Sequence, residues 1–185
     1  MASRRRASVV LLLLIVTAAG PLIRAQDGAA ADVSEVRAYR LTMPKVTSFF
    51  ATIVNLRKLA AANPELCAAV DPAELDEAMS LAEKGKQIEA SYPEVVPVLA
   101  AEGLTAHEFL VMAMAQLQAG MAVYAKSMGV KELPADVNPE NVAFMEQNKE
   151  RLDAMQMDLD KIPDPCEDTD EPYDNEGEDT EYDEE

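Results

Sequence analysis

The sequence predicts an all-α protein: an antiparallel helical bundle of about four main helices plus short helices, with a disordered acidic C-terminal tail. Two observations support this prediction. Apolar side chains recur three and four positions apart along the body of the chain, as they do on one face of a helix. Helix start and stop signals separate these segments, and no two segments are joined by the turn residues of a β-hairpin.

The N-terminal segment, residues 1–25, has the features of a secretory signal peptide. Three arginines at positions 4–6 precede an apolar run over residues 7–19, and Ala25 is a small residue suited to cleavage. The run is shorter than the roughly 20 residues that span a membrane. We therefore expect cleavage near Ala25 and a periplasmic or secreted protein with no membrane attachment. Cleavage within residues 29–31, or an uncleaved anchor, is the alternative.

The body of the chain divides into a flexible linker, residues 26–34, and a helical bundle domain, residues 35–163. Thr42 and Pro44 begin the first long helix, because threonine can cap a helix and a proline in the first turn costs no hydrogen bond. The helix is expected to end at residues 63–64, an Asn-Pro pair. Its apolar face consists of Val46, Phe49, Ile53, Leu56 and Ala60.

A second helix is predicted to begin at Asp71, which precedes a proline and has a carboxylate three positions further on. Its apolar face is thin, which indicates a place at the edge of the bundle. That face consists of Leu75, Met79 and Ala82. Pro93 and Pro97 interrupt the next segment, so we expect only a short helix that begins near Pro97 and ends at Gly103.

The longest apolar segment predicts the central helix, which ends at Gly129. Residues 109–115 are apolar on every side, which is typical of a buried helix. The expected inward face is Leu110, Met114, Leu117, Met121, Tyr124 and Met128. A last helix is predicted to begin at residues 138–139, an Asn-Pro pair. Its expected inward residues are Val142, Met145, Leu152, Met155 and Leu159.

The only histidine, His107, stands beside Glu108 at the start of the central helix. A zinc-protease helix needs a second histidine four positions later, and Val111 occupies that position. Thr105 and Glu108 instead have the spacing of an N-terminal capping box. In such a box Thr105 accepts a hydrogen bond from the amide of Glu108, and Glu108 accepts one from the amide of Thr105. We therefore assign no metal or catalytic residue here.

No other catalytic or cofactor-binding motif is present in the sequence. It contains no Gly-x-Ser-x-Gly elbow, no phosphate-binding glycine loop and no haem-attachment motif. We therefore expect no enzyme and no cofactor, and a hydrolase using a glutamate with His107 is the weakest alternative. Methionine thioethers could bind copper(I), but core packing is the favoured interpretation. The methionines concerned are Met112, Met114, Met121, Met128, Met145, Met155 and Met157.

Cys67 and Cys166 are the only cysteines, and export would place them where disulfides persist. Cys67 precedes the second predicted helix and Cys166 follows the last one, so both can lie at one pole of an antiparallel bundle. We predict a disulfide between them. Closing a loop of about 100 residues would stabilise the fold by roughly 4–5 kcal/mol in the chain-entropy account. The alternative is a buried Cys67 and an exposed Cys166.

Negative charge dominates the chain and is concentrated at its end. Removal of residues 1–25 takes away four arginines and no acidic residue, so the formal net charge falls from −18 to −22. This argues against binding to nucleic acid or to an anionic membrane surface. Residues 164–185 contain thirteen acidic and no basic residues, which predicts a disordered tail. Their spacing does not match an EF-hand loop. The tail either solvates the protein or contacts a basic protein surface or divalent cations.

Three stretches, "YRLTMPKV", "GLTAHEF" and "VNPENVAFMEQN", resemble segments of a functionally uncharacterised group of exported, helical bacterial proteins. The resemblance covers most of residues 39–155, implies a bacterial exported protein, and supplies no catalytic residue. We expect an exported interaction or scaffold module, with the acidic tail as an electrostatic contact or a solvating segment. The alternative is a periplasmic binder of divalent cations or metals that uses tail carboxylates or bundle methionines.

Overall fold

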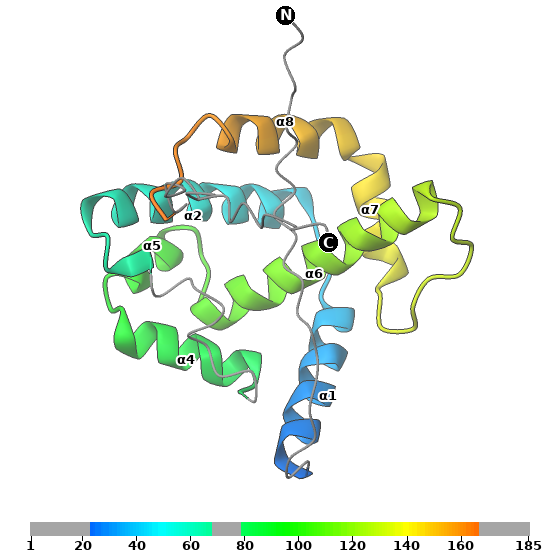
Figure 1. The fold of residues 1–185 in the computed structure, drawn as a ribbon, viewed down its shortest axis with the longest axis horizontal. Coiled ribbons are helices and arrows are strands. Elements are labelled where there is room, and N and C mark those ends of the chain that lie inside the picture. The colour runs from blue at the N-terminus through cyan, green and yellow to red at the C-terminus, as the bar shows by residue number, and fades with distance from the viewer. Residues whose placement is uncertain (1–22, 68–78, 167–185) are drawn as a thin grey trace, which may run out of the picture.

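The computed structural model describes residues 23–67 and 79–166, which form seven α-helices and no strand (Figure 1). The all-α prediction is confirmed for these residues, although they form more helices than the four main ones expected. The helices are α1 (Ile23–Ala38), α2 (Met43–Ala62), α4 (Leu81–Ser91), α5 (Val95–Ala101), α6 (Ala106–Ser127), α7 (Pro139–Gln147) and α8 (Lys149–Leu159). Most of the predicted signal peptide, and residues 167–185 of the predicted tail, lie outside the described residues.

Helix α1 covers residues 26–34, which the sequence analysis assigned to a flexible linker. That assignment is corrected by contacts to distant segments. Val36 is buried where α1 packs against α6. The Asp32 carboxylate accepts a hydrogen bond of 2.9 Å from the backbone nitrogen of Leu81, at the start of α4. The alanines at 29–31 favour a helix, and these tertiary contacts supply the stability that a weakly amphipathic segment lacks alone.

Helix α2 begins and ends where the sequence predicts. Thr42 precedes it in an extended conformation, Pro44 occupies its first turn, and Asn63 ends it. The Thr42 side chain makes no capping hydrogen bond, so the proline is the effective start signal. Val46 and Ala60 of the predicted apolar face are buried. The helix packs against α5 and α8.

Helix α4 begins at Leu81, behind a capping box that the sequence analysis did not identify. Ser80 Oγ accepts from the backbone nitrogen of Glu83 at 3.3 Å, and the Glu83 carboxylate accepts from the backbone nitrogen of Ser80 at 2.9 Å. The Glu83 carboxylate also accepts from Ser80 Oγ at 2.8 Å, and the bonds that it accepts from the Ser80 backbone nitrogen and hydroxyl lower the pKa of Glu83. The expectation of one helix running through Met79 is therefore wrong, since Met79 precedes the cap. The predicted start at Asp71 lies outside the described residues.

Helix α5 begins at Val95, two residues before the predicted start at Pro97. Pro97 is accommodated because it still lies in the first turn, where its missing N–H has no partner to lose. Gly103, with a φ of 74°, follows the end of the helix as predicted. In the part of the chain that the structure describes, no single helix is long and apolar enough to span a membrane. Helices α5 and α6 have the required length and composition only when taken together, and a bend of 66° separates them.

Helix α6 is central, as predicted, and packs against α1, α4, α5 and α7 (Figure 1). Its inward face was predicted wrongly in the second half of the helix. The buried residues are Ala106, Val111, Met112, Ala115, Ala119 and Ala122. The exposed fractions of the expected inward residues are 39% for Leu117, 63% for Met121, 67% for Tyr124 and 69% for Met128. Small alanine side chains allow neighbouring helices to approach closely, so the alanine face is buried in place of the methionine face.

The predicted last helix is two helices, α7 and α8, which meet at an angle at Asn148 (Figure 1). The Asn148 side chain donates to the Phe144 carbonyl at 2.8 Å, and this polar bond to the backbone helps to end α7. Asn138 caps α7 as predicted, accepting from the backbone nitrogen of Glu140 at 2.9 Å. The expected inward residues are buried or half-buried: Val142, Met145, Leu152, Met155 and Leu159.

Candidate functional site

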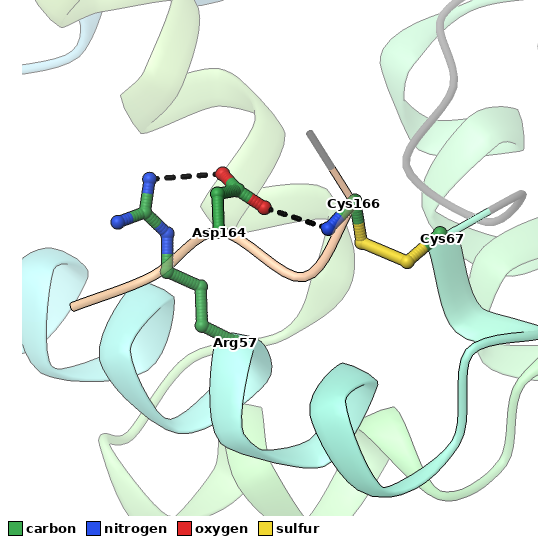
Figure 2. The surroundings of a disulfide bond; sticks show 4 residues. All are labelled: Arg57, Cys67, Asp164 and Cys166. Carbon is green, nitrogen blue, oxygen red and sulfur yellow. Dashed lines mark hydrogen bonds and ion pairs between the residues drawn. A yellow bond between two sulfur atoms is a disulfide. The ribbon is translucent and has the colours of Figure 1, made fainter. Parts of the chain in front are cut away.

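A disulfide joins Cys67, five residues beyond the end of α2, to Cys166, which lies beyond the end of α8 (Figure 2). Their Cα atoms are 5.0 Å apart, although 99 positions separate them in the sequence. Both side chains are half-buried against the apolar core. The structure therefore brings together the two residues that the sequence analysis paired, at one pole of the molecule.

The segment between α8 and the disulfide, residues 160–166, is called the strap here. Arg57 of α2 donates three hydrogen bonds here, one to the last residue of α8 and two to the strap. One guanidinium nitrogen, Nη1, donates to the carbonyls of Leu159 at 3.0 Å and Ile162 at 2.9 Å. The other, Nη2, donates to the Asp164 carboxylate at 2.9 Å (Figure 2). The strap is thus fastened at two places, by Arg57 and by the disulfide.

The strap corrects the predicted boundary of the disordered tail at Asp164. The Asp164 carboxylate accepts from Arg57 and, at 3.0 Å, from the backbone nitrogen of Cys166 (Figure 2). The disulfide fixes Cys166 itself. Residues 164–166 are therefore ordered by contacts with a distant helix, which composition alone does not reveal.

A cavity of about 260 Å³ lies between α2, α4, α5, α6 and the strap. Its wall is apolar, with side chains such as Ile53, Ile88, Leu99 and Phe109. Among the described residues that line the wall, only Arg57 and Asp164 are charged, and these pair with each other. Cys166 also lines the cavity, so the strap with its disulfide forms part of the wall.

The cavity wall favours a neutral, apolar ligand. An apolar cavity of about 150 Å³ in another protein stays dry and binds benzene. A cavity of 260 Å³ has room for a ligand of about ten carbon atoms on that scale. Because Arg57 and Asp164 neutralise each other, neither offers an unpaired charge to a charged ligand. The described lining residues include no nucleophile with a neighbouring base.

The predicted capping box at the start of α6 is half formed. Thr105 Oγ1 accepts from the backbone nitrogen of Glu108 at 3.1 Å, as expected. The Glu108 carboxylate does not return this bond to Thr105 but accepts from the Tyr39 hydroxyl at 3.3 Å. Glu89 of α4 caps the free amide of Ala106 at 3.1 Å. A carboxylate from another helix, Glu89 of α4, thus caps the positive end of α6 where Glu108 does not close the local capping box.

A cluster of titratable side chains surrounds this helix start. His107 Nε2 lies 3.0 Å from the Glu35 carboxylate, and Lys45 Nζ lies 4.0 Å from the centre of the Tyr39 ring. Burial, and then the charge of Glu108, raise the pKa of Tyr39. A raised pKa makes a phenol a poorer acid near neutral pH, the opposite of what general acid catalysis requires. We therefore interpret the cluster as a junction between α1, α2 and α6.

Two further predictions concern metal ligands. Among the described residues, no group of three or more His, Cys, Asp or Glu side chains is placed to hold a metal ion. The interpretation of the methionines as core residues is wrong for Met121, Met128 and Met157, which are exposed, and right for Met112, which is fully buried. The structure shows no reason for the exposed methionines to converge on one ion.

The sequence analysis missed Arg57, Asp164 and the cavity. One signal was available for Arg57, which is four positions after Ile53 and three before Ala60 on the predicted apolar face of α2. A charged residue at such a position needs a partner, but nothing in the sequence indicates that the partner is 107 positions away. Comparisons of the chain with protein-family models, with curated protein sequences and with solved structures found no match.

Proposed function

We propose that this protein is an exported helical bundle that binds a neutral apolar small molecule of about ten carbon atoms in the cavity beside the strap. One observation carries the proposal: the described residues around the cavity of about 260 Å³ are apolar except for Arg57 and Asp164, which pair with each other. Export, which residues 1–25 predict, would place such a binder in an aqueous compartment where apolar molecules need a carrier.

The expected affinity is modest. Each buried methylene group contributes about 0.8 kcal/mol, and association costs at least about 4 kcal/mol in lost translational and rotational freedom. Ten buried carbons thus leave a net gain of about 4 kcal/mol, and such a ligand should bind with a dissociation constant of about 1 mM at best. An affinity in this range suits a carrier that takes up and releases its ligand.

The test is calorimetric titration of 1-octanol into the full chain and two variants. Ala60→Leu adds three carbon atoms at a buried position in the cavity wall, and Ala154→Leu adds them on the exposed surface of α8. We expect one equivalent of octanol to bind to the unaltered chain and to Ala154→Leu with the same affinity. Ala60→Leu should bind at least about tenfold more weakly. Absence of saturable binding by the unaltered chain would overturn the proposal.

A second candidate function, an interaction or scaffold module, is favoured by the exposed apolar surface of α6. Leu117, Met121, Tyr124 and Met128 follow each other at three- and four-residue spacing, so they share one face of the helix. Contiguous exposed apolar side chains often mark a docking site for another protein. In this reading the acidic tail provides an electrostatic contact with a basic partner, or solvates the complex.

The test of this candidate is recovery of a partner from the exported fraction by the full chain and by the double variant Met121→Glu/Tyr124→Glu. A partner lost with the double variant would support docking on α6. A partner retained by the variant but released by salt or by deletion of residues 167–185 would instead implicate the tail.

Binding of divalent cations by the tail stays a prediction, since residues 167–185 lie outside the described residues. Calcium titration into the full chain and into a chain ending at Cys166 tests it. A shorter chain would remove the disulfide and the strap, and so confuse loss of the tail with damage to the fold. Saturable binding that disappears with the tail would support a cation site.

A further inference from the structure

We propose that the Cys67–Cys166 disulfide controls ligand retention: reduction by a dithiol frees the end of the strap and opens the cavity. The inference rests on the proposed ligand-binding function and adds its regulation. Its basis is that Cys166 has two roles in the structure, as one half of the disulfide and as part of the cavity wall.

The strap is held to the rest of the described chain by few bonds. Beyond α8 its backbone bonds are local, such as that from Ile162 to the Leu159 carbonyl at 2.9 Å. The non-local bonds in the described residues are those from Arg57 to the Ile162 carbonyl and the Asp164 carboxylate, and the disulfide. Reduction therefore removes the only covalent attachment at the far end.

The remaining ion pair cannot hold the wall in place by itself. The Arg57 and Asp164 side chains are 20% and 34% exposed, so water screens their attraction. The Asp164 carboxylate also accepts from the Cys166 backbone nitrogen, so Cys166 is linked to Arg57 through Asp164 (Figure 2). Once the sulfur–sulfur bond is broken, Asp164 and Cys166 can move away together. Both residues line the cavity, and their departure would remove part of its wall and widen its opening to solvent.

The chemistry is thiol–disulfide exchange with a dithiol reductant. A thiolate of the reductant attacks one sulfur of the Cys67–Cys166 bond, which breaks and leaves a mixed disulfide and one cysteine thiolate. The second thiol of the reductant then displaces the other cysteine. The protein gains two electrons and two protons, and the reductant becomes a cyclic disulfide. An oxidant of the disulfide class reverses the reaction and closes the strap.

The experiment measures the affinity of the full chain for 1-octanol before and after reduction with dithiothreitol, and again after reoxidation. We expect reduction to weaken binding at least about tenfold, by lowering the population of the closed strap, and reoxidation to restore it. The double variant Cys67→Ser/Cys166→Ser should bind as weakly as the reduced chain and should not respond to dithiothreitol.

Hydrogen exchange separates opening of the strap from global unfolding. The inference requires faster exchange of the Cys166 amide on reduction, while amides of buried α6 residues such as Met112 and Ala115 stay protected. Equal affinity of the oxidised and reduced chains would overturn the inference and leave the proposed function standing. Loss of protection throughout α6 on reduction would also overturn it. Absence of octanol binding in every form would overturn the proposed function and this inference together.

Discussion

Gly85 of α4 lies directly against the backbone of His107 at the start of α6. A Cβ atom at Gly85 would be 2.7 Å from the His107 backbone nitrogen and 2.9 Å from its Cα atom, closer than atoms can approach. The glycine is needed for this close approach between helices. One turn further along α4, Glu89 accepts from the Ala106 amide, and Ile88 lines the cavity. The contact therefore sets the position of one cavity wall.

Gly85→Ala should lower the free energy of unfolding by about 1–3 kcal/mol, because a backbone cannot yield as a flexible side chain can. Gly120→Ala on α6 is the matched control, since its Cβ would meet only the Met145 Cε atom at an ordinary 3.8 Å. The free energy of unfolding of Gly120→Ala should rise by about 0.5–1 kcal/mol, because alanine has a higher helix propensity than glycine. Urea denaturation measures both. A gain of the same size at Gly85 would show that α4 and α6 are not in contact there.

Thr52→Val should raise the free energy of unfolding by about 1 kcal/mol. The Thr52 hydroxyl on α2 is fully buried and has no hydrogen-bond partner among the residues that the structure describes, so it bears a desolvation cost that valine avoids at nearly the same volume. Thr47→Val, at an exposed position of the same helix, should change the free energy of unfolding by less than about 0.5 kcal/mol. Thermal unfolding checks the pair. Destabilisation by Thr52→Val would mean that the hydroxyl has a partner after all.

Tyr39→Phe should change how stability depends on pH. The pKa of Tyr39 is raised in the fold, so the protonated phenol is favoured there. The stability that this protonated phenol contributes to the fold is complete below the ordinary tyrosine pKa of about 10. It is lost as the pH rises above that value towards the pKa of Tyr39 in the folded protein. At pH 7 the variant should be about 1 kcal/mol less stable, because it lacks the hydrogen bond to Glu108.

The difference in free energy of unfolding between wild type and Tyr39→Phe should therefore narrow between pH 9 and about pH 11. Urea denaturation at several pH values measures it, and Tyr124→Phe on the exposed surface of α6 controls for loss of a phenol. A difference that stays constant over this range would contradict the coupling between Tyr39 and Glu108.

The disulfide should be complete in the native protein and important for stability. Intact mass after alkylation without reductant should show no modified thiol. Cys67→Ser/Cys166→Ser should lower the free energy of unfolding by about 2–5 kcal/mol, since the unfolded chain regains the freedom of a 99-residue separation. Arg57→Lys keeps the charge but cannot form the same three bonds, and should cost less than the double cysteine variant. Two alkylated thiols in native material would contradict the pairing.

Local signals in the sequence predict most helix ends correctly. Pro44, Asn63, Thr105 and Asn138 each act within one turn of their own position, so their effect can be deduced without the rest of the chain. The break at Asn148 escapes this reasoning, because asparagine is also tolerated within helices and only the observed bond to Phe144 reveals its role.

The inward face of α6 shows a second limit. Its methionine face and its alanine face have the same helical period, so periodicity cannot choose between them. The choice depends on which face other helices can approach closely. The face with the small residues Ala115, Ala119 and Ala122 is the one that is buried. Predicting the largest apolar residues as the core was therefore wrong beyond Met114.

The cavity could not have been predicted because it is made by residues far apart in the sequence. Arg57 and Asp164 are 107 positions apart and meet only once α2, α8 and the strap are assembled. The disulfide could be predicted because the chain has only two cysteines, which leaves a single intramolecular pairing. A cavity between packed helices has no comparable signal in the composition or the residue spacing of the sequence.

The most direct test of the central claim is the affinity of the full chain for a series of 1-alkanols from hexanol to dodecanol, measured by calorimetry. An apolar cavity should strengthen binding by about 0.8 kcal/mol per added methylene while the alkyl chain still fits inside it. The gain should stop near ten carbon atoms, when a cavity of 260 Å³ is full. An affinity that does not change along the series, or that keeps rising to dodecanol equally in Ala60→Leu, would show that the cavity does not bind these ligands.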